Sequence, residues 1–212
     1  MTRIEALSQL TQGIDTLLDI GTDHGYVVID AIQKGYIHKA IACDVNPKPL
    51  ENARRNVMNS GLSNEIKVVL SDGFKNIEDT YDGVLIAGMG MHLAKNILSQ
   101  SHTPAKKYIL QVNNHVDELR LYLSNNQYKI VDEITVFDKF HYVIIVCEKG
   151  HMILNEKDLF VGPMLKNKKN ALAYYENQMA ILKRNFNKAN GHKKQVFGLK
   201  ISYLSEIIDL LI

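Results

Sequence analysis

Hydrophobic positions in the first 150 residues alternate between two patterns. Short apolar runs are typical of buried strands, and stretches with apolar residues three or four positions apart are typical of helices. The predicted strands are Thr16–Ile20, Ala40–Asp44, Ile66–Leu70, Gly83–Ile86 and Lys107–Val112. The predicted helices are 2–12, 25–34, 47–61, 91–98 and 116–125. This alternation predicts a largely parallel sheet with helices on both faces.

Two further β-rich runs close this part of the chain. They are Tyr128–Phe137 and His141–Cys147, and only a few polar residues separate them. Such spacing predicts a hairpin, so the last strand should run antiparallel to its neighbours. The expected sheet therefore has seven strands.

The hydrophobic period changes near Gly150. One apolar seam recurs at seven-residue intervals, and a second advances in steps of three and four, as in a coiled coil. The first seam comprises Leu165, Leu172, Met179 and Phe186 with Tyr175, Leu182 and Ala189, and the second comprises Phe197, Ile201, Leu204, Ile208 and Leu211. Because Asn190-Gly191-His192 separates them, we predict an antiparallel helical hairpin. The predicted domains are 1–150 and 151–212.

Composition places this chain among globular proteins. The 212 residues are 46% hydrophobic, which is enough for a sizeable core. No apolar run approaches a membrane span, and the N-terminus lacks a signal-peptide core, so we expect a cytoplasmic protein without a membrane role. Cys43 and Cys147 lie in apolar runs and are expected to be core residues, neither disulfide-bonded nor metal ligands.

The charge is distributed unevenly. Residues 1–150 hold 15 Lys and Arg against 18 Asp and Glu, whereas residues 151–212 hold 10 against 5. A basic tail suggests a polyanionic partner, although a solvated helix surface would look the same. The candidate contacts are Lys166, Lys168, Lys169, Lys183, Arg184 and Lys188.

The stretch TLLDIGTDHG at residues 16–25 predicts a strand, a glycine loop and the start of a helix. It lacks the G-x-G-x-x-G spacing of dinucleotide sites, and Asp19 and Asp23 would repel a phosphate. The loop suits a ligand with a cationic amino-acid end, such as S-adenosylmethionine. Asp44 ends the next strand, where a carboxylate can bind both ribose hydroxyls. A simple turn between strand and helix is the alternative for the two glycines.

Two more strand ends should face the same crevice. Asp72 could accept a hydrogen bond from an adenine amino group, with Gly73 leaving room for the ring, or could cap a helix over 73–78. After the fourth strand, AGMG offers backbone groups and no acidic residue.

A ring nitrogen acceptor such as adenine N1 would need positioning and a carboxylate, for which Asp23 is a candidate unless it binds the methionine amino group. His24 could orient Asp23, touch the acceptor or be structural.

Residues after the fifth strand are candidates for contact with the acceptor. Asn113 and Asn114 could hydrogen-bond a base edge. Tyr142 could stack on a base, although a strand tyrosine is usually a core residue.

The motifs DIGTDHG, CDVNPKPLENA, SDG, IAGMG, ILQVN and FVGPMLKNKKNA resemble the bacterial tRNA (adenine 22-N1)-methyltransferase family over nearly the whole chain. The resemblance implies a Rossmann-like class I methyltransferase with a C-terminal coiled-coil hairpin. It also implies methyl transfer from S-adenosylmethionine to N1 of adenine 22 in the D-arm region of tRNA. Met91 and Val112 depart from the usual glycine and proline, which affects the acceptor side.

By the same resemblance, residues of these motifs take functional roles. The implied cofactor site comprises Asp19, Gly21, Thr22, Asp23, His24, Gly25, Asp44, Val45, Asp72, Gly73 and Gly88. The implied acceptor side comprises Asp23, Met89 and Asn113, with the loop Gly88–Gly90. We expect a monomer that needs no metal.

Three other functions compete with this reading. A class I methyltransferase for a small molecule or a protein would share the cofactor site and would not need the basic tail. A non-catalytic nucleic-acid-binding module would bind no cofactor. A nucleotide-dependent oxidoreductase is disfavoured by the acidic loop and the absence of G-x-G-x-x-G.

Overall fold

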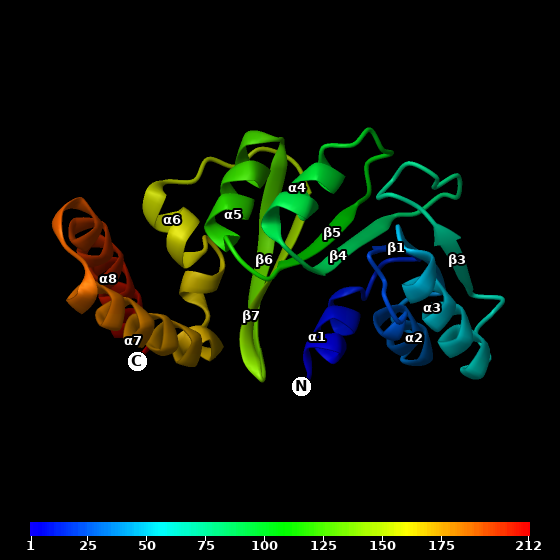
Figure 1. Cartoon of the computed structure of the whole chain (residues 1–212), viewed down its shortest axis with the longest axis horizontal. Helices are drawn as coiled ribbons and strands as arrows, with labels where there is room; N and C mark the ends of the chain where they lie inside the picture. Colours follow the sequence, from blue (N-terminus) through cyan, green and yellow to red (C-terminus); the bar gives the residue numbers. More distant parts are fainter.

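A single mixed sheet forms the centre of the computed structural model, which describes residues 1–212. The strands lie in the order β3-β2-β1-β4-β5-β7-β6, and β7 is antiparallel to both its neighbours (Figure 1). The strands are β1 Thr16–Ile20, β2 Lys39–Asp44, β3 Ile66–Leu70, β4 Gly83–Met89, β5 Lys107–Val112, β6 Tyr128–Asp138 and β7 Phe140–Lys149. The seven-stranded sheet with an antiparallel last strand is therefore confirmed.

Helices cover both faces of this sheet because the central strands are apolar on both sides. In β1, Leu17 packs in one hydrophobic cluster with α1 and α2, and Leu18 packs in the other with α4 and α5. The helices are α1 Arg3–Leu10, α2 Tyr26–Gln33, α3 Pro47–Asn59, α4 Met91–Leu98, α5 Val116–Asn125, α6 Glu156–Val161, α7 Leu172–Lys188 and α8 Gly191–Leu211. No helix is long and apolar enough to cross a membrane.

The C-terminal helices form the expected hairpin, with α7 beside α8 (Figure 1). The helical pattern that we predicted from Leu165 is wrong at its start, because α7 begins at Leu172 and two short 3-10 turns precede it. The physical cause is the carboxylate of Glu133. It accepts hydrogen bonds from the backbone N–H groups of Met164 and Leu165, which holds this segment against β6.

A continuous core joins the hairpin to the sheet. Leu165, Tyr175 and Leu204 belong to the same hydrophobic cluster as Leu18 in β1. The predicted division at residue 150 is therefore not a break in packing. Cys147 lies in the same cluster, and burial of both cysteines as free thiols confirms their expected place in the core.

Candidate functional site

The loop between β1 and α2 is held in a left-handed backbone conformation at three of its positions. Gly21, Asp23 and Gly25 have φ angles of +80°, +52° and +72°. The N–H groups of Gly21 and Thr22 donate to the carbonyl oxygen of Cys43 at 2.8 and 3.0 Å, which fixes the loop against β2. A Cβ atom on Gly21 would lie 2.9 Å from Cε of the flexible Met89 side chain, and the φ angle of +80° is one that residues with a side chain rarely adopt, so glycine is favoured here.

Asp19 places a buried carboxylate beneath this loop. The side chain is 5% exposed, and its Oδ2 atom accepts a hydrogen bond from Oγ1 of Thr22 at 2.6 Å. Burial, with a smaller effect from the nearby charge of Asp44, raises the pKa of Asp19 to about 6, although the hydrogen bond from Thr22 lowers it in part. A cationic ligand beside this carboxylate would offset the cost of burying its charge.

A cavity of about 180 Å³ opens between this loop and α1. Its lining includes Arg3, Asp19, Gly21, Thr22, Asp23, His24 and Gly88. The structure therefore brings together the first part of the predicted cofactor site. The acidic donor set and the glycine cradle fit the amino-acid end of S-adenosylmethionine, as the sequence predicts. Gly25 lies behind the loop, where a Cβ atom would contact Ala53.

His24 is positioned by its neighbours at the edge of this cavity. Its ring stacks on Tyr26 with centroids 5.2 Å apart, and its Nε2 atom lies 3.5 Å from Oδ2 of Asp23. The backbone carbonyl of His24 accepts a hydrogen bond from Asn56. These contacts suit a residue that orients Asp23.

The remaining predicted cofactor residues follow β2 and β3 on a more open part of the surface. One oxygen of Asp44 accepts a hydrogen bond from the backbone N–H of Asn46 at 2.8 Å, while Val45 is 57% exposed. Asp72 pairs with Lys75 at 2.5 Å, and Gly73 adopts a φ of +65°. None of these residues lines the cavity of about 180 Å³ beside Asp19.

The alternative role of Asp72 as a helix cap is wrong. Residues 73–76 form a turn and residues 77–78 have no regular structure, so no helix follows Asp72. The hydroxyl oxygen of Ser71 accepts a hydrogen bond from the backbone N–H of Asn76. The side-chain oxygen of Gln100 accepts one from the backbone N–H of Phe74. Side chains from elsewhere thus satisfy the N–H groups that a helix would have left unpaired.

A polar network fixes the Gly88–Gly90 loop to the end of β5. The side-chain amide of Asn113 donates to the carbonyl of Gly88 at 2.8 Å, and its backbone N–H donates to the carbonyl of Met89 at 2.9 Å. The N–H of Met91 donates to Oδ1 of Asn114 at 3.1 Å. Asn113 and Met89, both predicted for the acceptor side, therefore lie together with the loop.

Gln111 and Arg3 complete this network, and neither was identified from the sequence. The Oε1 atom of the buried Gln111 accepts hydrogen bonds from the N–H of Gly88 at 3.1 Å and from Arg3 at 3.0 Å. Its amide donates to Oδ1 of Asn113 at 3.1 Å. The Arg3 guanidinium also lies 5.1 Å from the ring centroid of Tyr142. The sequence offered no signal for Arg3 beyond a charge in a short amphipathic helix.

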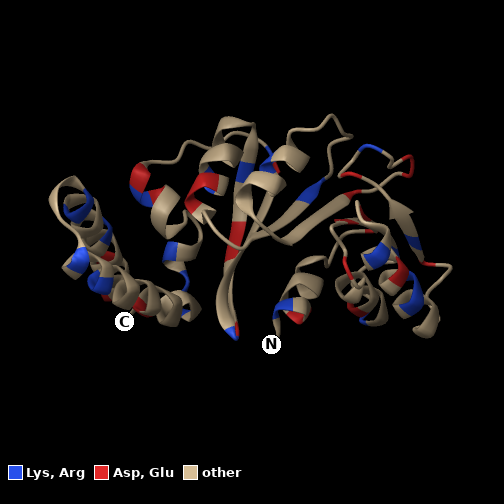
Figure 2. Ribbon diagram, in the orientation of Figure 1, with Lys and Arg blue, Asp and Glu red and all other residues tan.

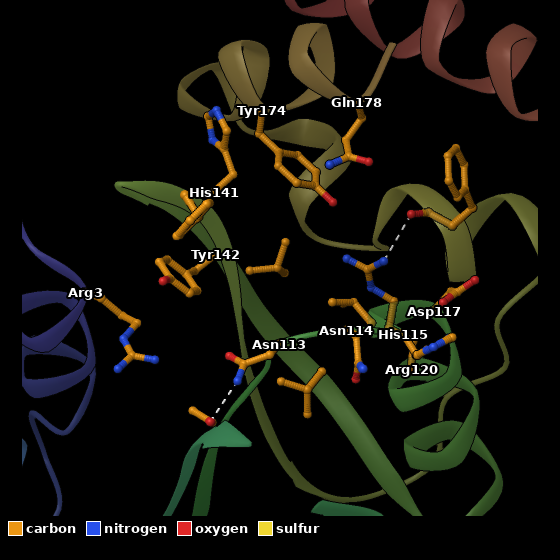
Figure 3. Close-up of a pocket in the computed structure, with 16 residues that line it drawn as sticks. Arg3, Asn113, Asn114, His115, Asp117, Arg120, His141, Tyr142, Tyr174 and Gln178 are labelled. Carbon is orange, nitrogen blue, oxygen red and sulfur yellow. Dashed lines mark hydrogen bonds between the residues drawn. The ribbon is translucent and has the colours of Figure 1, made fainter. Parts of the chain in front are cut away.

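A larger cavity of about 780 Å³ lies on the other side of this network (Figure 3). Figure 3 shows Arg3, Tyr142 and Asn113 along one side and Tyr174 and Gln178, both from α7, across from them. The lining is polar and aromatic, which is suitable for a nucleobase. Sequence reasoning identified Asn113, Asn114 and Tyr142 here but missed the contributions of His115, Arg120, His141, Tyr174 and Gln178.

The predicted nucleic-acid contacts fall into two groups. Lys166 pairs with Asp158 at 2.6 Å, and Lys168 pairs with Asp132, so both lysines help to hold the tail. The other four are exposed and take part in none of the ion pairs: Lys169, Lys183, Arg184 and Lys188. Figure 2 shows blue segments gathered on α7 and α8. Lys193 and Lys194, which the sequence-based set omitted, are also exposed there.

Taken together, the strand order and the acidic, glycine-bracketed cavity at the carboxyl ends of the parallel strands define a class I methyltransferase. No group of three or more His, Cys, Asp or Glu residues is arranged to hold a metal. A family model described as tRNA (adenine(22)-N(1))-methyltransferase matches residues 17–209. The chain belongs to this family, which confirms the expectation from the motifs.

Individual relatives agree with this assignment. The tRNA (adenine(22)-N(1))-methyltransferase of Bacillus subtilis is 31% identical over 181 residues, which cover 80% of this chain and 76% of that protein. The structure of M. capricolum TrmK with S-adenosyl-homocysteine is 28% identical, with a TM-score of 0.85 and coverage of 100% of this chain and 99% of that chain. Streptococcus pneumoniae Sp1610 in complex with S-adenosyl-L-methionine is 30% identical, with a TM-score of 0.84 and coverage of 98% and 100%. The chain is therefore an S-adenosylmethionine-dependent tRNA (adenine-N1)-methyltransferase.

Proposed function

We propose that the smaller cavity holds the amino-acid end of S-adenosylmethionine and that the larger cavity receives adenine 22 of tRNA. The observation that carries this proposal is that Arg3 and Gly88 line both cavities. The two cavities therefore meet at the Gly88–Gly90 loop, where a methyl group would have to pass. S-adenosylmethionine, when bound, supplies an electrophilic methyl group on a sulfonium, so alignment provides much of the acceleration.

On this proposal, each acidic residue binds a different group of the cofactor. Asp19 faces the cationic ammonium, because its buried carboxylate lies beneath the loop that lines this cavity. Asp44 binds the ribose hydroxyls through the oxygen that Asn46 leaves unoccupied. Asp72 accepts from the adenine amino group, while Val45 and Gly73 flank the ring.

Asn113 acts as a positioning residue in this scheme. Both ends of its amide are engaged, one with Gly88 and the other with Gln111. Its task is to hold the loop, while the amide nitrogen of Asn114 is available for a base edge. Adenine N1 has a lone pair, so the acceptor needs orientation and a carboxylate near the positive charge that develops. Asp23 is the exposed carboxylate on the cofactor side of the loop and takes that role.

The exposed cations of α7 would bind tRNA phosphates. N1 lies on the pairing edge of adenine, so the base must leave its pair before it enters the cavity. A monomer remains part of this proposal. A tRNA substrate also supports the expected cytoplasmic location.

Transfer of a labelled methyl group from S-adenosylmethionine to unmodified tRNA tests the proposed activity. Nucleoside analysis is expected to find 1-methyladenosine, mapped to position 22 in the D-arm region. If the chain bound S-adenosylmethionine but methylated no tRNA, the small-molecule or protein methyltransferase would replace this proposal.

A substitution of Asp44 tests the assigned ribose contact. We expect Asp44→Ala to weaken S-adenosylmethionine binding roughly 10- to 100-fold, because hydrogen bonds to a charged acceptor are lost. Isothermal titration calorimetry measures this affinity, and circular dichroism verifies the fold. Asp15→Ala is a matched control, since Asp15 is an exposed carboxylate at the opposite end of β1. Equal affinity in the two variants would remove Asp44 from the site.

A further inference from the structure

The tip of the β6–β7 hairpin presents two phenylalanine rings to solvent. Phe137 is 66% exposed and Phe140 is 68% exposed. The chain has six phenylalanines, and the other four are buried or half-buried. Two exposed rings on one narrow tip are an unusual use of apolar surface, because each gains free energy when water is removed from it.

The hairpin holds these rings in fixed positions. Lys139 closes the tip with a φ of +62°, and Asp138 lies opposite Phe140 while Phe137 lies opposite His141. Because successive strand residues point to opposite faces, the two rings lie on opposite faces of the ribbon. The backbone N–H of Arg3 donates to the Asp138 carboxylate at 3.0 Å, which attaches the tip to α1.

The tip is continuous with the larger cavity. Phe140, His141 and Tyr142 all line it, and Arg3 lies over the Tyr142 ring. On the other face of the ribbon, the His141 ring lies 4.9 Å from that of Phe137 and 6.0 Å from that of Tyr174 in α7. The hairpin tip and the adjoining wall of the larger cavity therefore combine aromatic rings with the positive charges of Lys139 and Arg3.

Aromatic side chains beside cations are the usual means of holding single-stranded nucleic acid. Removing a base from its stack costs free energy, which falls when other rings stack on the bases left exposed. We infer that Phe137 and Phe140 each stack, one on each face of the tip, on a tRNA base that adjoins adenine 22 once that adenine has entered the cavity. This inference rests on the proposed function, because it requires tRNA at the larger cavity.

The test compares tRNA binding and methylation by the full-length protein with Phe137→Ala and Phe140→Ala, singly and together. From the usual contribution of stacking on one base, the Kd for tRNA is expected to rise roughly 5- to 100-fold in the double variant. The affinity for S-adenosylmethionine should stay unchanged. Stacking releases no counterions, so the slope of log Kd against log salt should also remain that of the wild type.

Two further variants separate stacking from general apolar contact. Phe140→Tyr keeps an aromatic ring and should retain most of the affinity, whereas Phe140→Leu should lose it. Ile153→Ala is the matched control, because Ile153 is 98% exposed and lines neither of the two cavities. Both phenylalanine rings are exposed, so their removal should leave the folded core intact.

Several outcomes would overturn the inference. It fails if the double alanine variant binds and methylates tRNA as the wild type does, or if Phe140→Leu matches Phe140→Tyr. It also fails if Ile153→Ala weakens tRNA binding equally. A wild-type protein that forms no 1-methyladenosine would instead reject the proposed function, so the two failures are distinguishable.

Discussion

At the scale of single residues, the proposed cofactor site contains a carboxylate whose charge is costly to bury. Asp19 is almost fully buried and has one hydrogen bond, from Thr22. Its pKa is raised to about 6 because burial disfavours the charged form. A group with a raised carboxyl pKa binds more protons in the folded state, so its contribution to stability falls as the pH rises from about 4 through about 6. A bound ammonium group would reverse that loss.

The first prediction concerns Asp19→Asn. Asparagine keeps the shape and removes the buried charge, so the free energy of unfolding at pH 7 should rise by about 3 kcal/mol. Affinity for S-adenosylmethionine should fall roughly tenfold or more, because the ammonium loses its partner. Denaturant unfolding and calorimetry at several pH values measure both quantities.

The wild-type affinity for S-adenosylmethionine should also weaken below a pH of about 6, whereas that of the asparagine variant should stay flat. The assignment of Asp19 would be abandoned if the two proteins had the same affinity at pH 7. Thr16→Ser, at the other end of β1, serves as a control for changes in the strand itself.

At the scale of elements, the position of each lysine decides its role. Lys166 and Lys168 lie in the 3-10 segment and at its end, where they pair with Asp158 and Asp132. Lys183, Arg184 and Lys188 lie in the last part of α7 and face solvent. Reversing the charges of Lys166 and Lys168 would disturb the attachment of the tail. A loss of tRNA binding in such a variant would therefore not show that these lysines contact tRNA.

The second prediction concerns those three exposed cations of α7. Replacing Lys183, Arg184 and Lys188 with glutamine should weaken tRNA binding at moderate salt and lower the slope of log Kd against log salt by about 2 to 3. Cofactor affinity should not change. Filter binding over a salt series measures the slope. A triple variant with the wild-type slope would show that phosphates do not contact this part of the helix.

At the scale of the whole molecule, a buried ion pair between α5 and β6 holds the tail through further hydrogen bonds to its backbone. The Nε atom of Arg120 in α5 donates to Glu133 in β6 at 2.7 Å, and both side chains are at most 1% exposed. Arg120 also donates to the carbonyls of Leu159 and Phe160, at 2.9 and 3.1 Å. The tail therefore satisfies charges that the sheet buries. Deletion of residues 151–212 would remove the backbone groups that hydrogen-bond to this pair and would expose core, so it would not isolate catalysis from tRNA binding.

The third prediction follows from this arrangement. Glu133→Gln should lower the free energy of unfolding by about 3–5 kcal/mol, because it leaves the Arg120 guanidinium buried without its counter-charge. Unfolding should remain a single transition, since the core is continuous. Thermal and urea unfolding, followed by far-ultraviolet circular dichroism and tyrosine fluorescence, measure both properties.

Glu148→Gln is a suitable control, because Glu148 is a less buried carboxylate in the neighbouring strand β7. Two separate transitions in the wild type would contradict the single packed body. An unchanged stability of Glu133→Gln would show that the pair contributes little.

Much of the fold was predictable because its signals are local. The β1 run Thr16–Ile20 and the helix Met91–Leu98 have the predicted bounds, since hydrophobic periodicity and bounding glycines act over a few residues. The start of α7 was not predictable, because a carboxylate in β6 decides it. The turns after Asp72 escaped prediction for the same reason, since Gln100 supplies their partner.

The sequence by itself determined the order of strands and helices along the chain, the acidic strand ends and the family, all of which depend on residue type and short spacing. Only the tertiary structure decided that Arg3 lies where the two cavities meet, through a hydrogen bond to Gln111 across 108 positions of sequence. It likewise decided which lysines are paired and that the Phe137–Phe140 tip borders the larger cavity. Such contacts depend on how distant segments pack, and no local pattern encodes them.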